Sequence, residues 1–105
     1  MFINGDLISQ EELELEQSIY TAGRIEAGEN LVGLLDRDNP NNVQEVRSDK
    51  SIFVGGDVYF ISKLTAPIIV IGGIVLTKPG QSTIFECEQL SIAGTGYTSR
   101  EIPPN

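Results

Sequence analysis

The 105-residue sequence has no histidine, no tryptophan and a single cysteine, Cys87. Without histidine there is no Ser-His-Asp or Cys-His catalytic arrangement, no imidazole base and no histidine-ligated zinc. One cysteine forms neither an intrachain disulfide nor a four-cysteine metal site. We therefore expect a protein that is not an enzyme and that holds no metal and no cofactor.

Basic residues are also scarce. The chain has 7 Lys and Arg residues and 15 Asp and Glu residues, which gives a net charge of −8. Residues 1–50 carry most of this excess, with 11 acids and 4 bases. An acidic surface repels phosphate backbones and anionic lipid head groups, so we expect no nucleic-acid partner.

Long apolar runs are absent too. The most apolar segment, residues 66–76, is about half as long as a membrane helix, and no positively charged leader begins the chain. We expect no membrane span and a cytoplasmic location, with the virion as the alternative location.

The residues that are present favour strands. Val, Ile, Thr, Phe and Tyr dominate the apolar positions, and Gly, Asn and Pro interrupt them, which is typical of an all-β fold. Ser9 and Glu12 have the spacing of a helix capping box, but Leu13 and Leu15 alternate with glutamates, which favours a strand. We expect one domain over 1–105, with a short Pro-containing tail at 99–105.

Apolar residues recur every six positions. Six residues supply one short strand and a corner, and three such units make a triangular coil of about 18 residues whose alternate side chains point inward. The pattern predicts a short three-sided β-solenoid with corners at Gly55-Gly56 and Gly72-Gly73. The six-residue series are Leu7, Leu13, Ile19, Ile25 and Leu31, then Val46, Ile52, Val58, Leu64, Val70 and Leu76, then Ile84 and Leu90.

A second repeat supports a different fold. Residues 52–60, 68–76 and 84–92 align at a spacing of 16, and each is followed by a turn-rich stretch, the last of them residues 93–99. In this interpretation, the second half is an antiparallel meander in a β-sandwich or small barrel, and the paired glycines are bulges.

One oxygen-rich segment separates the first two six-residue series. The helix-loop-helix calcium pattern fails there, because Pro40 occupies a ligand position. We expect an exposed functional loop without metal, formed by Asp36, Asp38, Asn39, Asn41 and Asn42. Further on, Glu86 and Glu88 flank Cys87 and are expected to raise its thiol pKa, which disfavours a reactive thiolate.

The stretches LELEQSIYTAGRIEAGENLVG (13–33) and GGDVYFISKLTAPIIVIGGIVL (55–76) resemble the rungs of bactofilins, the bacterial polymer-forming cytoskeletal proteins. The resemblance covers roughly residues 7–92. It implies a right-handed β-solenoid that polymerises end to end. Hexapeptide acyltransferases share the six-residue period, but they require a histidine base that this chain lacks.

Three hypotheses of function follow. The first is a structural protein that self-associates into a filament or scaffold through its terminal strand edges, with Phe2 and Ile3 at one end and Leu90 and Ile92 at the other. The second is a virion protein, a capsid decoration or cement protein or a tail component, that forms a closed oligomer and uses residues 1–18 as an extended arm. The third is an acidic inhibitor that mimics nucleic acid in the basic groove of a partner.

Overall fold

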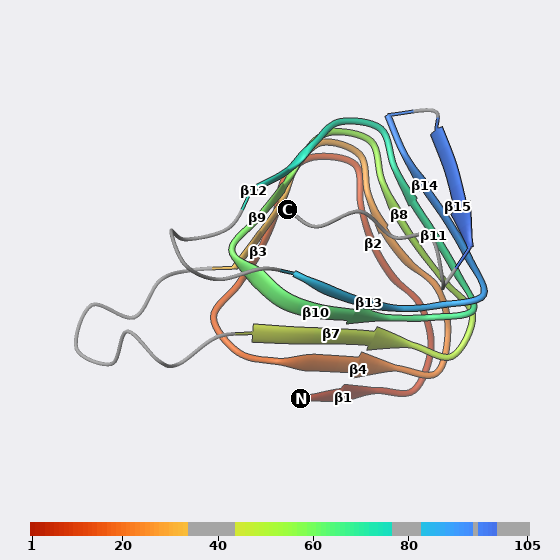
Figure 1. Cartoon of the computed structure of the whole chain (residues 1–105). Helices are drawn as coiled ribbons and strands as arrows, with labels where there is room; N and C mark the ends of the chain where they lie inside the picture. Colours follow the sequence, from red (N-terminus) through yellow and green to blue (C-terminus); the bar gives the residue numbers. More distant parts are fainter. Residues whose placement is uncertain (34–43, 77–82, 94, 99–105) are drawn as a thin grey trace.

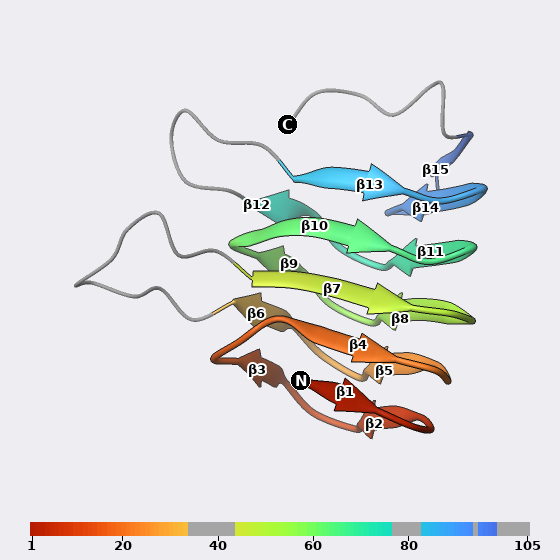
Figure 2. The same ribbon diagram turned by 90° about the horizontal axis from the view of Figure 1, so that it is seen from below.

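The computed structural model describes residues 1–33, 44–76, 83–93 and 95–98. The chain winds around a triangle (Figure 1), and its coils stack on one another along the axis (Figure 2). Each side of the triangle is a β-sheet, and every strand pair is parallel except that of β14 (Gln89–Ile92) with β15 (Thr95–Thr98). The three-sided solenoid is therefore confirmed, and the antiparallel sandwich or barrel is wrong.

Within each sheet, the strands follow one another along the axis in the order of the chain. The first sheet contains β1 (Phe2–Ile3), β4 (Ile19–Thr21), β7 (Gln44–Ser48), β10 (Ile61–Thr65) and β13 (Ile84–Glu86). The second contains β2 (Leu7–Ser9), β5 (Ile25–Ala27), β8 (Ser51–Val54), β11 (Ile68–Ile71), β14 and β15. The third contains β3 (Leu13–Leu15), β6 (Leu31–Gly33), β9 (Val58–Tyr59) and β12 (Val75–Leu76).

The core is a set of side-chain columns that run along the solenoid axis. In the second sheet, Ile25, Ile52 and Ile69 are paired in register, and all three are completely buried. Burial of a side chain of this size stabilises the fold by about 2 kcal/mol. Because each coil covers its neighbour, the stack buries a core that no single coil could bury.

The six-residue period predicts the register of the first coils. Leu7 pairs with Ile25, 18 positions further on, as three six-residue units require. The period is wrong in the fourth coil, where Ile69 pairs with Ile52, only 17 positions away. A shift of one residue turns a strand's inward set outward, so Ile69 is buried and Val70 is not.

The shift arises at the corner that contains Pro67. Val46 and Leu64 pair with each other, as do Ile52 and Ile69, so this corner is one residue shorter than the corner in the coil below. Two other residues of the predicted inward series also face outward: Leu76 is 40% exposed and Ile84 is 57% exposed.

Glycines permit the close stacking of the corner between the second and third sheets. A Cβ on Gly55 would collide with the carbonyl oxygen of Gly28, and a Cβ on Gly72 would collide with that of Gly55. Only glycine allows backbones to approach this closely. Gly55-Gly56 and Gly72-Gly73 are therefore corners, as the solenoid pattern predicted, and not bulges within strands.

Side-chain oxygens connect the coils at the same corner. The Asn30 Oδ1 accepts the backbone N–H of Asp57 at 2.9 Å, and the Asp57 Oδ1 accepts that of Ile74 at 2.9 Å. Each amide or carboxylate thus satisfies a corner donor of the next coil, where no strand partner is available.

Residues 1–18 form the first coil and not an extended arm. Their strands β1, β2 and β3 pair in parallel with β4, β5 and β6 of the second coil. The alternation of Leu13 and Leu15 with glutamates is typical of a strand. Leu15 is buried in the core, and Leu13 packs against the core while it stays partly exposed.

Candidate functional site

The end of the solenoid formed by β1, β2 and β3, which we call the first-coil end, is an open edge. Among the described strands, none pairs with its outer side. The Leu7 N–H donates to the Arg24 carbonyl, and the Ser9 carbonyl accepts from Gly28, so these groups face the second coil. Alternate residues of a strand face opposite neighbours, so the backbone N–H and C=O of Ile8 point to the open edge.

The same alternation holds on the other two sides. The Ile3 carbonyl accepts from Ala22, and the Leu13 N–H donates to Asn30. The backbone groups of Phe2 and Glu14 therefore face outward along the axis. Together with Ile8, they present three sets of unpaired backbone donors and acceptors, the kind of edge onto which another strand adds.

The core is unsealed at the first-coil end. Ile3, Leu7 and Leu13 pack against the core but stay partly exposed, whereas Ile25 and Leu31, one coil further in, are completely buried. A terminal repeat usually carries a polar cap that covers such a surface. In the part of the chain that the structure describes, no residue covers the partly exposed apolar surface of the first coil.

An aromatic ladder reaches this end on the outer face of the first sheet. The Phe2 and Tyr20 rings stack with centroids 5.1 Å apart, and the Arg47 guanidinium lies 4.8 Å from the Tyr20 centroid. The Tyr20 hydroxyl donates to Asp49 at 2.7 Å, which raises the pKa of Tyr20. Phe2 is 60% exposed, so the ladder ends at this end of the solenoid in a solvent-exposed aromatic ring.

Acidic residues line the third side of the first-coil end. Glu12, Glu14 and Glu16 are exposed on and around β3. The side-chain hydrogen bond with Glu12, and then the negative charges of Glu12 and Glu16, raise the pKa of Glu14. These carboxylates therefore lie close enough to repel one another.

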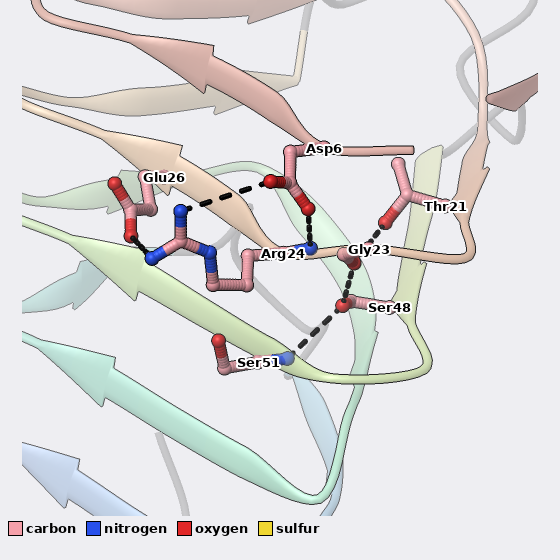
Figure 3. A network of polar contacts seen from close by, with 7 residues as sticks. All are labelled: Asp6, Thr21, Gly23, Arg24, Glu26, Ser48 and Ser51. Carbon is pink, nitrogen blue, oxygen red and sulfur yellow. Dashed lines mark hydrogen bonds and ion pairs between the residues drawn. The ribbon is translucent and has the colours of Figure 1, made fainter. Parts of the chain in front are cut away.

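A polar network joins the first coil to the second and third (Figure 3). Asp6 accepts the Arg24 N–H at 2.8 Å, and the Arg24 guanidinium also contacts Glu26 at 3.1 Å. Deeper in, the Thr21 and Ser48 hydroxyls both donate to the Gly23 carbonyl. This network fixes the first coil in place and neutralises Asp6.

The opposite end of the solenoid differs. β15 runs antiparallel along the outer side of β14, so one of the three sheets is closed there by the chain itself. Leu90 is only 2% exposed and Ile92 is partly buried. The structure therefore separates the four expected self-association residues: Phe2 and Ile3 lie at an open edge, whereas Leu90 and Ile92 lie on a strand that is paired on both sides.

A shallow pocket of about 350 Å³ lies between the first and second sheets near this end, and it includes Arg47, Pro67 and Cys87. Burial raises the pKa of the Cys87 thiol, in the direction expected, although the expected cause was the flanking acids. A protonated, half-buried thiol is a poor nucleophile.

The candidate loop lies outside the described residues. It comprises Asp36, Asp38, Asn39, Asn41 and Asn42.

Two edge residues were not singled out from the sequence. Ile8 and Glu14 follow Phe2 at intervals of six, one residue after the inward positions Leu7 and Leu13. The repeat itself could have identified them, because the residue after each inward position faces outward.

Comparison with known proteins gives no family. A scan against protein-family models, a search of the curated proteins and a search of the solved structures find no match to this chain. Among the described residues, no group of His, Cys, Asp and Glu could hold a metal ion, and no helix is long and apolar enough to cross a membrane.

Proposed function

We propose that this chain is a non-enzymatic structural protein that self-associates through the strand edges of its first-coil end, as a filament or scaffold of the bactofilin kind. The observation that carries the proposal is the open end itself. Among the described residues, three unpaired strand edges surround an unsealed core, so docking of a second copy would satisfy backbone groups and cover Ile3, Leu7 and Leu13 at the same time.

The test is sedimentation velocity over a range of protein and salt concentrations. Ile8→Pro removes the edge N–H without affecting the bonds of Leu7 and Ser9 to the second coil, and proline is tolerated in edge strands. Ile8→Ala is the matched control, because it removes the same exposed side chain and keeps the N–H. We expect Ile8→Pro to weaken association about tenfold and Ile8→Ala to weaken it less.

A wild-type chain that sediments as a single copy under every condition would refute the proposal. Equal association of Ile8→Pro and the wild type would show that another surface makes the contact. Open-ended polymers favour a filament, which needs a second contact besides the first-coil end. A two-fold dimer favours association through the first-coil end alone, and a larger closed species of fixed stoichiometry favours the virion alternative.

A further inference from the structure

The charged side chains of the first-coil end are all acidic, and the Met1 ammonium, which donates to the Ser18 carbonyl at 3.0 Å, adds one positive charge there. Residues 1–18 contain five acids and no Lys or Arg. Arg24 of the second coil neutralises Asp6. The remaining four acids take part in none of the ion pairs found among the described residues, and they are Glu11, Glu12, Glu14 and Glu16.

Three of these acids follow the open edge of β3. The backbone of Glu14 faces the edge, its side chain is exposed, and Glu12 and Glu16 lie two positions to either side. A strand that paired here would place alternate side chains opposite these carboxylates. Its other side chains would lie against Leu13 and Leu15, on the core side.

A pocket beside β3 extends the site. It has a volume of about 290 Å³ and lies where the first coil meets the second. Met1, Leu15 and Ile19 supply its apolar surface. Glu14, Glu16 and Gln17 supply polar groups, so it fits a side chain with an apolar stem and a cationic head.

We infer that β3 of the first-coil end takes an extended cationic segment of a different protein, one in which Lys or Arg alternates with apolar residues, as an added parallel or antiparallel strand. The inference rests on the proposed function only in using the same open end. At β3, charge complementarity favours this occupant over a second copy, because a second copy would bring its own glutamates to that edge. The strands β1 and β2 contain no charged residue, so this repulsion does not act along them.

The two occupants are expected to respond to salt in opposite ways. Binding of a cationic strand weakens as salt screens the attraction, whereas self-association strengthens as salt screens the repulsion between two acidic ends. A bound cationic strand also covers the edge, so it caps self-assembly.

The probe is the labelled synthetic peptide Lys-Val-Lys-Leu-Lys-Val-Lys, followed by fluorescence anisotropy at low and high salt. The control peptide has the same composition in two blocks, four lysines and then three apolar residues. We expect the alternating peptide to bind about tenfold more tightly than the block peptide at low salt, because only alternation matches the strand. Equal binding of the two peptides would overturn the inference.

The second arm changes the protein. The triple variant E12Q/E14Q/E16Q removes the charges along β3, and we expect it to bind the alternating peptide about tenfold more weakly than the wild type. Unchanged binding by this variant would overturn the inference.

The matched control removes three exposed charges that lie off β3, by E29Q/E45Q/E88Q, and is expected to weaken binding less than the β3 variant does. An equal loss of peptide affinity in both triple variants would mean that the peptide is attracted to the net negative charge of the protein and not to β3. That result would also overturn the inference. Circular dichroism checks that both variants fold. Self-association is measured separately, without peptide. If the chain does not self-associate, the proposed function is refuted, and the peptide-binding result still decides this inference.

Discussion

The substitution Ser48→Ala tests how the polar network holds the coils together. Ser48 is 2% exposed, and its Oγ accepts the backbone N–H of Ser51 at 3.1 Å and that of Lys50 at 3.0 Å. The hydroxyl donates in turn to the Gly23 carbonyl, one coil away. Alanine retains nearly the same volume, so the change removes hydrogen bonds and leaves little cavity.

The loss in the free energy of unfolding of Ser48→Ala depends on what each former partner of the hydroxyl binds instead. The Gly23 carbonyl keeps the hydroxyl of Thr21, which donates to it at 2.8 Å, and the Lys50 N–H can bind water. The buried N–H of Ser51 loses its acceptor, which costs about 2 kcal/mol. In a chain of this length, that lowers Tm by roughly 10 °C.

Thr21→Val is the matched control, because Thr21 is completely buried but its hydroxyl only donates to a carbonyl that Ser48 also serves. We expect a cost of about 1 kcal/mol or less. Urea unfolding at 25 °C, followed by circular dichroism, gives the change in the free energy of unfolding for each variant. The m-values are compared to check that both variants unfold in the same way as the wild type. A Thr21→Val cost equal to or above that of Ser48→Ala would refute the reasoning, because the stranded N–H would then carry no penalty.

Three further predictions concern Ala93, the tyrosines Tyr20 and Tyr59, and Glu14. Ala93 has φ of 52°, in the left-handed region, so Ala93→Gly should raise the urea midpoint of unfolding by relieving about 1 kcal/mol of strain. Hydrogen bonds to Asp49 and Asp57 raise the pKa values of Tyr20 and Tyr59; stability is therefore expected to fall as pH rises from about 10 through these raised values, and ultraviolet titration should show two late-ionising phenols. Because nearby carboxylates raise the pKa of Glu14, Glu14→Gln should increase Tm at neutral pH and low salt but not below pH 4, where the carboxyl is protonated.

The sequence patterns were sufficient to predict the class of fold. The inward series from Leu7 to Leu31 has the period of the coil, and glycine pairs mark corners because a Cβ there would meet the backbone below. The register of the fourth coil could not be predicted, because Pro67 signals a corner but not its length. Because the corner is shorter by one residue, Ile69 lies in the core in place of Val70, which the six-residue series predicted there.

The candidate site was predicted in part, and for a physical reason. Phe2 and Ile3 form β1, which is an edge strand of the first sheet. The glycines and threonines of the stretch 93–99 are typical of turns, yet Thr95–Thr98 is a strand that closes β14. Strand pairing between distant residues depends on tertiary packing more than on local propensity, so composition alone did not reveal this closure.

The difference between the two ends constrains the form of the assembly. An antiparallel strand such as β15 breaks the parallel stacking of the second sheet, so a further coil cannot continue in register on that side. The first-coil end has no such strand among the described residues, and all three of its edges remain available. If only this end associates, two copies meet through the same surface and the assembly closes as a two-fold dimer. A filament requires a second contact, and the outer edges of β12 and β13, unpaired among the described strands, are where it would have to form.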